Sequence, residues 1–290
     1  MDDNERKKTI DSWHIRADPY EILINNYEIF SNMAMGLIKF VEKHRDKYDK
    51  DINIIDLAAG TGLVSKLLIE YLHISPSSLY LIEPAERMFL HAKQNLNNSH
   101  LYNVAAEDCL TIPDLPLHYF DFILCNASMH LMSENNIYPV ISKLLKPKKG
   151  FFLYTIWYHS FDETEHYKCD QIETYINDAL TYFNYPKYFI TINRKKSITT
   201  RSRKSLEETA NKSGLKLESC TIDIHRSPLT FDLDFMLMTP NWLIEHLKTN
   251  QWTQNDNIYL IRERIIEKIR ELIKGKFSEI PVVQIIVSKI

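Results

Sequence analysis

Apolar residues in the middle of the chain alternate between short continuous runs and longer stretches with helical spacing. Residues 52–57 (INIIDL) form the first run, and residues 63–73 repeat apolar side chains three and four positions apart, which is typical of one helix face. Similar runs lie at 78–83, 101–106, 119–126 and 150–157, and similar helical stretches at 85–97 and 134–146. Strands that alternate with helices in this way predict right-handed crossovers around a parallel sheet with both faces covered.

The chain outside this region is less regular. Apolar residues at helical spacing over 20–44 predict an N-terminal helical segment, and residues 162–184 predict a helix after the fifth strand. Residues 205–215 predict a helix closed by Gly214, since a positive φ is easiest for glycine. Two further strands are expected at 216–224 and 282–290, and two further helices at 232–248 and 256–274. The pattern therefore predicts an α/β protein with a seven-stranded, doubly wound sheet and a late helical insertion.

Composition narrows the function classes. The 290 residues carry a net charge of −3 at pH 7, so no overall positive field attracts nucleic acid or an acidic membrane surface. The charged start lacks the apolar stretch of a secretory signal, and no run approaches the length that spans a bilayer. The 4 cysteines are scattered and form no Cys-x-x-Cys pair. We therefore expect a cytoplasmic protein with no metal site, no nucleic-acid partner and no membrane contact; the sequence leaves the oligomeric state open.

A glycine-containing turn follows the first predicted strand, within NIIDLAAGTGLVSKLL at 53–68. Gly60 and Gly62 lie here, where bare backbone N–H groups at a helix start can approach a ligand. A dinucleotide site usually has a third glycine, and Ser65 stands in its place. Asp56 ends the strand, where a carboxylate suits the ammonium group of an amino acid better than a pyrophosphate. S-adenosylmethionine (SAM) combines a nucleoside with an amino acid, so the turn favours SAM.

The strands that follow end in residues that suit the same ligand. Glu83 ends the second strand, where a carboxylate can accept hydrogen bonds from both ribose hydroxyls. After the third strand, Asp108 offers an acceptor for the adenine amino group, with the Cys109 backbone beside it. The fourth strand ends at Asn126, within CNASMHLM.

Together these segments resemble the motifs of the class I (Rossmann-like) SAM-dependent methyltransferase superfamily, small-molecule type. IIDLAAGTG resembles the first motif, with Ala58 where glycine is usual, and LIEPAERM resembles the second. EDCLTIPDLPLHYFDFILCNASMH resembles the third and fourth motifs in order and spacing. LLKPKKGFFLYT resembles the turn before the fifth strand, with Lys148 and Lys149 where two glycines are usual.

The resemblance implies a mostly parallel sheet with an antiparallel last strand, and SAM as the cofactor, with S-adenosylhomocysteine as its product. It implies a helical lid over 1–50, a SAM-binding core over 51–160, and the rest of the sheet with substrate-pocket insertions over 161–290. By position it implies these cofactor-binding residues: Asp56, Ala58, Gly60, Gly62, Glu83, Pro84, Met88, Asp108, Cys109 and Asn126. Helix capping by Asp56, a helix start at Glu83 and a surface turn at Asp108 are the structural alternatives.

Candidates for the acceptor site lie near the carboxyl ends of the fourth and fifth strands, where open α/β sheets bind ligands. A base, if the acceptor needs one, is sought among His130, His159 and Tyr27, although packing alone would also explain these side chains. Acceptor-binding residues are sought among Tyr20, Trp157, Tyr158 and Met236, and Trp13, Tyr20 or Tyr27 could face the sulfonium from a lid. The six basic residues within 194–204 could receive an anionic substrate, but a solvated linker is favoured.

The predicted activity is methyl transfer from SAM to a small molecule in an apolar pocket. O-methylation of a carboxylate or hydroxyl is favoured; the layout is also similar to small-molecule N-methyltransferases. A macromolecular methyltransferase and a SAM-binding protein without methyl transfer stay open as other classes.

Overall fold

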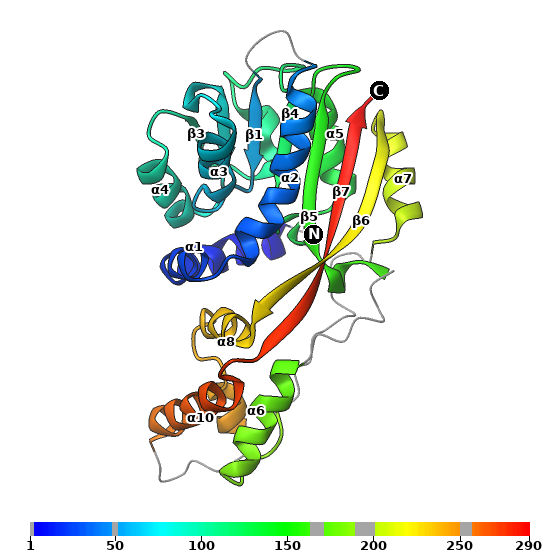
Figure 1. Ribbon diagram of the computed structural model, residues 1–290. Helices are drawn as coiled ribbons and strands as arrows, with labels where there is room; N and C mark the ends of the chain where they lie inside the picture. The colour runs from blue at the N-terminus through cyan, green and yellow to red at the C-terminus, as the bar shows by residue number, and fades with distance from the viewer. Residues whose placement is uncertain (1–2, 48–51, 163–170, 189–200, 250–256) are drawn as a thin grey trace.

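A computed structural model describes residues 3–47, 52–162, 171–188, 201–249 and 257–290. A seven-stranded sheet with helices on both faces forms the larger part of the molecule (Figure 1). Its strands are β1 (Ile54–Leu57), β2 (Leu79–Ile82), β3 (His100–Tyr102), β4 (Phe122–Cys125), β5 (Phe151–Trp157), β6 (Leu215–Pro228) and β7 (Phe277–Lys289). Its longer helices are α1 (Asp3–Asn26), α2 (Ile29–Arg45), α3 (Leu63–Leu72), α4 (Glu86–Asn95), α5 (Glu134–Leu144), α6 (Gln171–Tyr182), α7 (Arg203–Lys212), α8 (Leu229–Leu237), α9 (Ile244–Thr249) and α10 (Ile258–Ile273).

The strand order is β3-β2-β1-β4-β5-β7-β6, and β7 runs antiparallel to both of its neighbours. This confirms the predicted seven-stranded sheet with an antiparallel last strand. The order reverses between β1 and β4, which pair in parallel from Ile54 beside Phe122 to Asp56 beside Leu124. Such a reversal opens a crevice at the carboxyl ends of the two strands, where ligands of open α/β sheets bind.

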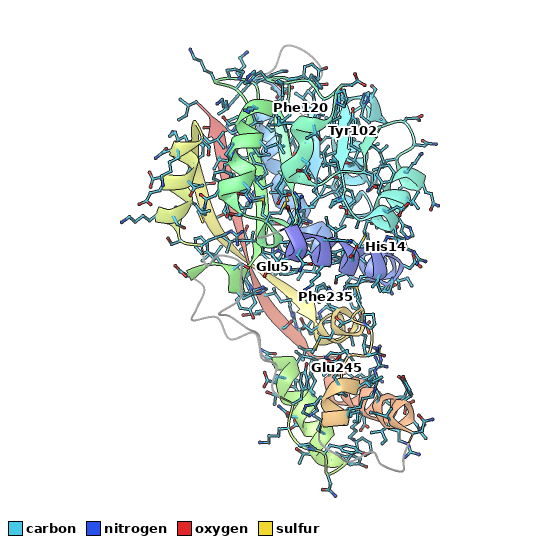
Figure 2. The ribbon with its side chains drawn as sticks, turned by 180° about the vertical axis from the view of Figure 1, so that it is seen from behind. Glu5, His14, Tyr102, Phe120, Phe235 and Glu245 are labelled. Atoms are coloured by element: carbon cyan, nitrogen blue, oxygen red, sulfur yellow. The ribbon has the colours of Figure 1, made fainter. Side chains whose placement is uncertain are left out.

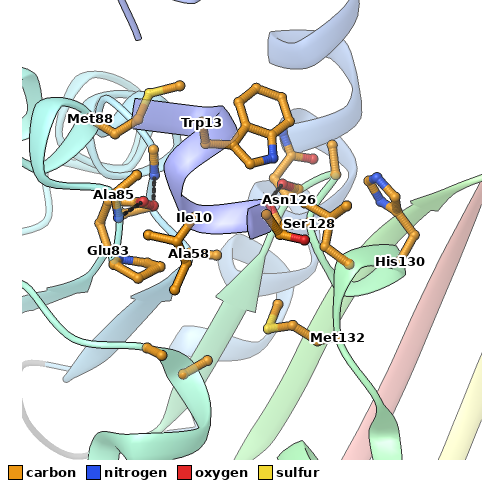
Figure 3. Close-up of a pocket in the computed structure, with 18 of the residues that line it drawn as sticks. Ile10, Trp13, Ala58, Glu83, Ala85, Met88, Asn126, Ser128, His130 and Met132 are labelled. Atoms are coloured by element: carbon orange, nitrogen blue, oxygen red, sulfur yellow. Dashed lines mark hydrogen bonds between the residues drawn. The ribbon is translucent and has the colours of Figure 1, made fainter. Parts of the chain in front are cut away.

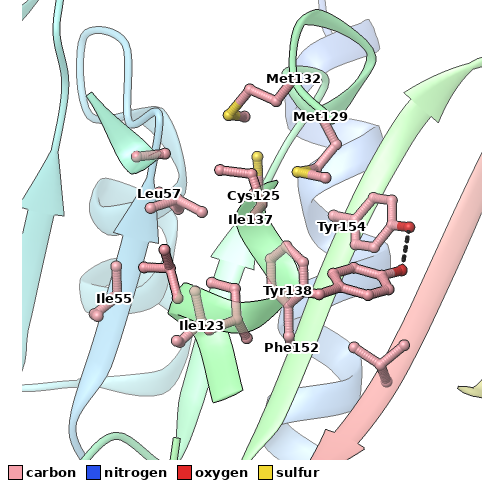
Figure 4. Close-up of a cluster of buried hydrophobic side chains, with 14 of the residues drawn as sticks. Ile55, Leu57, Ile123, Cys125, Met129, Met132, Ile137, Tyr138, Phe152 and Tyr154 are labelled. Carbon is pink, nitrogen blue, oxygen red and sulfur yellow. Dashed lines mark hydrogen bonds between the residues drawn. The ribbon is translucent and has the colours of Figure 1, made fainter. Parts of the chain in front are cut away.

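Two apolar layers hold the helices on the sheet. Because side chains alternate along a strand, Ile54 faces the layer under α2 and α3 while Ile55 faces the layer under α5 and α7. Figure 4 shows the second layer, in which the hydroxyls of Tyr138 and Tyr154 share a hydrogen bond of 2.8 Å. The strands β1, β2 and β4 are buried throughout, as expected for parallel strands covered on both faces.

The last two strands continue beyond the sheet as a two-stranded ribbon. β5 pairs with β7 only from Phe151 to Trp157, whereas β6 and β7 stay paired as far as Pro228 beside Phe277. The ribbon leads to α8 and α10, which pack with α6 and α9 around a separate apolar cluster (Figure 1). This distal helical cluster corresponds to the predicted late insertion.

The predicted helices at 20–44 and 232–248 are each divided into two in the structure, the latter into α8 and α9. The N-terminal helix begins at Asp3, well before the predicted residue 20, and a second helix begins at Ile29. Part of the predicted 162–184 helix and residues 194–200 lie outside the described residues, and so does position 256. None of the helices described is long and apolar enough to cross a bilayer.

The prediction that the basic segment 194–204 is a solvated linker is wrong at one position. Arg201 is 1% exposed, and its guanidinium pairs with Glu134. The same group donates 2.8 Å hydrogen bonds to the carbonyl oxygens of Met129 and Met132. A buried carboxylate and two carbonyl groups thus compensate the burial of this charge.

Candidate active site

A cavity lies at the carboxyl ends of β1, β2 and β4. Its floor is formed by the turn before α3, the start of α4 and the loop after β4, and α1 covers it. Figure 3 shows Glu83 and Met88 on one side of this first cavity and Ser128 and His130 on the other. Its position is the crevice that the strand order predicts.

The turn after β1 supplies bare backbone to the cavity. Gly60 has φ +58°, and the closest heavy atom to a Cβ built on it would be Cε1 of Tyr20 at 3.8 Å. The protein therefore leaves the space beside this residue to a ligand. Gly62 has a different role, because a Cβ on it would lie 2.6 Å from Cδ1 of Leu96. Ala58 lines the cavity with φ +53°, a value that favours glycine.

Two buried carboxylates face the cavity. Glu83 accepts hydrogen bonds of 2.8 Å from the backbone N–H groups of Gly60 and Ala85. Asp56 accepts two hydrogen bonds from Ser65, one from its backbone N–H at 3.1 Å and one from its hydroxyl at 2.7 Å. Burial raises the pKa of each carboxyl group to about 7. Ser65, which replaces the third glycine of a dinucleotide motif, thus fixes the Asp56 side chain. A carboxylate can accept more than two hydrogen bonds, so both groups keep capacity for a ligand.

The loop after β4 is held by a side chain of β5 and a backbone carbonyl group of α2. Asn126 donates to the carbonyl oxygen of Phe30 at 3.0 Å and accepts from the hydroxyl of Thr155 at 2.8 Å. The same hydroxyl accepts from the backbone N–H of Ala127 at 2.8 Å. Arg201 holds the next part of this loop from the other side, through Met129 and Met132. His130 lies between these two anchors.

Polar contacts fasten α1 over the cavity. Asp18 pairs with Arg87 and, at 2.9 Å, with His91, both on α4. Arg6 pairs with Asp108 at 3.1 Å. Side chains of α1 that line the cavity are Arg6, Thr9, Ile10, Trp13 and Tyr20. Their spacing of three, four and seven positions places them on one helix face.

Most of the residues proposed from the sequence come together in the first cavity. Its lining includes Asp56, Ala58, Gly60, Glu83, Pro84, Met88, Asn126, Tyr20, Trp157 and His130. The proposed adenine contacts do not lie there: Ala105, Ala106 and Glu107 line the cavity, whereas Asp108 turns to Arg6 and Cys109 is buried in the sheet core. Gly62 is also outside the lining.

Two residues proposed for the acceptor site lie elsewhere. The hydroxyl of Tyr27 donates to Asp234 at 2.6 Å, and its ring packs on Phe231 rather than lining either cavity. Met236 packs in the distal helical cluster, while its neighbour Phe235 lines the cavity. Adjacent residues of a helix point about 100° apart, so a shift of one position changes which side they face.

A second cavity adjoins the first, between α1, the loops after β4 and β5, α8 and the ribbon. The residues that line both cavities are Thr9, Trp13, His130, Leu131, Trp157 and Phe235. Tyr158 and His159, proposed from the sequence, line the second cavity alone. In Figure 2, Phe235 lies between α1, marked by Glu5 and His14, and the distal helices, marked by Glu245.

His130 lies where the two cavities meet. Burial, with smaller effects of His159 and Arg201, lowers the pKa of the His130 imidazole to about 3. Its Nδ1 atom is buried and has no hydrogen-bond partner among the described residues. The His159 ring lies 6.2 Å away, centroid to centroid. His130 is therefore a neutral imidazole that borders both cavities.

The charges and shape of the first cavity fit SAM. Asp56, Glu83 and Glu107 line it against a single cationic side chain, Arg6, and the ligand is itself a cation with an ammonium and a sulfonium group. Aromatic rings of Trp13, Tyr20 and Phe30 line the same space. Aromatic faces attract a sulfonium through cation–π interactions.

Comparison with protein families agrees with this site. Residues 48–211, more than half of the chain, match the family model described as methyltransferase domain, so the chain belongs to this family. It is a SAM-dependent methyltransferase. No curated protein sequence matches the chain.

Solved methyltransferase structures are similar only at a distance. The geranyl diphosphate C-methyltransferase of Streptomyces coelicolor A3(2) is 13% identical, with a TM-score of 0.45 over 88% of this chain and 79% of that one. The YcgJ protein of Bacillus subtilis is 12% identical, with a TM-score of 0.48 over 89% of this chain and 97% of that one. Family membership rests on the sequence match, and these distant likenesses say nothing about the acceptor.

Proposed function

We propose that the protein transfers the methyl group of SAM to a small organic acceptor bound in the second cavity. The observation that carries this proposal is that the two cavities meet along the shared lining of Trp13, His130 and Trp157, beneath α1. The second cavity, which α1 and α8 line, suits an acceptor of small size. O-methylation of a carboxylate or hydroxyl is the favoured reaction, and N-methylation is the alternative.

The cofactor is proposed to be held as follows. Asp56 accepts a hydrogen bond from the ammonium group of SAM, and Glu83 accepts hydrogen bonds from the ribose hydroxyls. Pro84, Met88 and Ala106 flank the adenine. When bound, SAM supplies an electrophilic methyl group on a sulfonium sulfur. The chain itself aligns the acceptor and excludes water, which for a displacement of this kind can supply most of the rate acceleration.

The role of His130 depends on the acceptor. A carboxylate is already ionised at neutral pH and needs no base, whereas a hydroxyl or amine must lose a proton. The His130 imidazole is the proposed proton acceptor in the second case, because it borders both cavities. Because the pKa of His130 is about 3, the imidazole stays neutral across the physiological range. A pKa this low also makes His130 a weaker base than an ordinary histidine, because general bases are most effective when their pKa lies near the operating pH.

The test uses SAM labelled in its methyl group, with small-molecule extract, total protein and RNA offered as separate acceptors. We expect the label in small molecules. Label in protein or RNA would make the enzyme a macromolecular methyltransferase, and tight binding of SAM without transfer to any fraction would make it a binding protein. Gly60→Val is the matched inactive variant, since its branched side chain enters the space that Gly60 leaves open.

The kind of acceptor follows from His130→Ala. For a hydroxyl or amine acceptor, kcat should fall roughly 10²- to 10⁴-fold. For a carboxylate, kcat should change little. His159→Ala is the companion variant, because His159 lines only the second cavity.

A further inference from the structure

The second cavity carries charge of the opposite sign to the first. Its lining from α1 consists of Lys8, Thr9, Ser12, Trp13 and Arg16. Lys8, Ser12 and Arg16 are four residues apart, so two cations and a hydroxyl follow one line along the helix. The first cavity, by contrast, is lined by three carboxylates and one arginine.

Arg16 is the side chain of this cavity that lacks an anionic partner among the described residues. Its guanidinium donates one hydrogen bond, from Nη2 to the hydroxyl of Thr239 at 3.2 Å, and lies 5.6 Å from the centre of the Trp13 ring. Its Nε atom is buried without a hydrogen-bond partner in the described part of the chain. Burial lowers the pKa of the Arg16 guanidinium, and no carboxylate among the described residues offsets this. A half-buried cation with an unused donor is costly until an anion pairs with it.

The other titratable groups of the cavity do not neutralise Arg16. Asp232 is its only lining carboxylate among the described residues; it accepts from the hydroxyl of Ser278 at 3.0 Å, and burial raises its pKa to about 6. His130 is neutral because its pKa is lowered to about 3. Lys8 adds a second cation at the exposed side. The cavity therefore has more positive than negative charge around neutral pH.

The remaining walls are apolar. Trp157, Phe231, Phe235 and Ile280 line the cavity opposite α1, and the rings of Phe231 and Phe235 lie 5.9 Å apart. A purely ionic molecule would leave these surfaces in water, whereas a molecule with an apolar body buries them.

We propose that the second cavity binds an organic anion with an apolar body, whose acidic group pairs with the Arg16 guanidinium while its body lies against Trp157 and Phe235. This inference rests on the proposed function, because it names the class of acceptor for the same site. Arg16 suits the task because a guanidinium can hold a carboxylate or phosphate through two parallel hydrogen bonds. Lys8 draws the anion to the entrance.

The experiment measures binding by calorimetry with the full chain saturated with S-adenosylhomocysteine. The probes are naphthylacetate, indole-3-acetate and octanoate, each paired with its neutral primary amide. We expect the carboxylates to bind roughly ten- to a hundredfold more tightly than the amides, as the loss of a charge-assisted hydrogen bond implies. Arg16→Gln should remove this preference and leave the affinity for S-adenosylhomocysteine unchanged, since Arg16 does not line the first cavity.

Arg264→Gln is the matched control, because it removes the same charge from an exposed position on α10. It should leave the preference for carboxylates intact. The inference is overturned if no carboxylate binds, if the amides bind equally well, or if Arg16→Gln and Arg264→Gln behave alike. Failure of the unaltered protein to bind S-adenosylhomocysteine would instead contradict the SAM site itself, so the two failures are distinguishable. Arg16→Lys, which keeps the charge but not the paired donors, should retain only part of the preference.

Discussion

At the scale of single residues, the turn after β1 combines a ligand-binding geometry with a residue that strains it. Ala58 takes φ +53°, while the next backbone N–H, that of Ala59, donates to the carbonyl oxygen of Ile82 at 3.0 Å. The hydrogen bond fixes the turn, and the turn then imposes the left-handed conformation on an alanine. Such a conformation costs an L-residue roughly 1–2 kcal/mol.

Ala58→Gly should therefore keep or raise the stability of the protein. Removing the strain gains roughly 1–2 kcal/mol, and the greater freedom of glycine in the unfolded chain costs roughly 0.5–1 kcal/mol. We expect the free energy of unfolding, measured in urea, to rise by between zero and about 1.5 kcal/mol. Ala210→Gly is the control: Ala210 lies inside α7 and is fully buried, so glycine there should cost more than about 1 kcal/mol, through lower helix propensity and the loss of a core methyl group. A loss at position 58 equal to that at 210 would contradict the strain.

Glu83 should make the ligand-free protein less stable as the pH rises. Its pKa is about 7 when folded and near the ordinary 4.5 when unfolded, so the folded state binds the proton more tightly. The contribution of this group is complete below about pH 4.5 and is lost as the pH rises through about 7. Glu83→Gln should flatten this decline, which for one proton is at most about 1.4 kcal/mol per pH unit.

Urea unfolding at a series of pH values measures the decline. Asp56 has a similar pKa, so part of the fall in stability with rising pH remains in the Glu83→Gln variant. Glu70→Gln, at an exposed position of α3, is the control and should leave the slope unchanged. A slope that Glu83→Gln and Glu70→Gln leave equally unaltered would show that Glu83 is ionised in the folded protein.

At the scale of elements, hydrophobic periodicity predicted every strand but only part of the helix that closes the site. α1 contains Pro19 and has few buried residues, because much of its inner face borders a cavity rather than the core. The signal that marks it is mixed in polarity: Arg6, Thr9, Trp13 and Tyr20 share one face at helical spacing. A search for apolar residues alone does not detect such a face. It therefore missed the helix over residues 3–19, which includes Arg16.

Arg201 was beyond sequence reasoning for a related reason. A basic run is usually solvated, and the partner that buries Arg201 lies 67 positions away, at the start of α5. Only the fold brings Glu134 and the loop after β4 to the same place. The ion pair therefore joins α5, the cavity loop and the segment before α7.

Arg201→Met should be strongly destabilising, because it leaves the Glu134 carboxylate buried without its cation. Removal of one partner of such a pair costs roughly 3–5 kcal/mol in urea unfolding. Adding Glu134→Gln to Arg201→Met should recover part of the loss. Lys204→Met is the control, since Lys204 is exposed and lies 4.0 Å from Glu208, and it should change stability by less than about 0.5 kcal/mol. Equal effects of Arg201→Met and Lys204→Met would mean that the buried pair does not hold the loop.

At the scale of the whole molecule, the number and order of strands could be predicted from the sequence, but the division of the elements into two packing units could not. Periodicity is local, so it located β6 and β7 without showing that they pair beyond the reach of β5. The misplacement of Met236 has the same origin. Which side of α8 faces the cavity depends on the distal helical cluster, whose members α6 and α10 are far apart in sequence.

This division predicts that the distal helical cluster can be loosened without loss of cofactor binding. Ile265 is fully buried in that cluster, and Ile265→Ala should cost roughly 2–5 kcal/mol of local stability. Hydrogen exchange should then quicken in α6 and α10 and stay unchanged in β1 and β4. Affinity for S-adenosylhomocysteine should hold, because apart from Phe235 the residues that line the first cavity come from α1 to α4, the sheet and the loops at its edge, and none comes from α6, α9 or α10. Binding of the organic anion should weaken, since α8 supplies Phe231 and Phe235 to the second cavity and packs on the distal helices. Ile55→Ala, in the core at β1, is the counterpart, and it should weaken the binding of both ligands. If Ile265→Ala reduced cofactor affinity as much as Ile55→Ala, the two packing units would be energetically one.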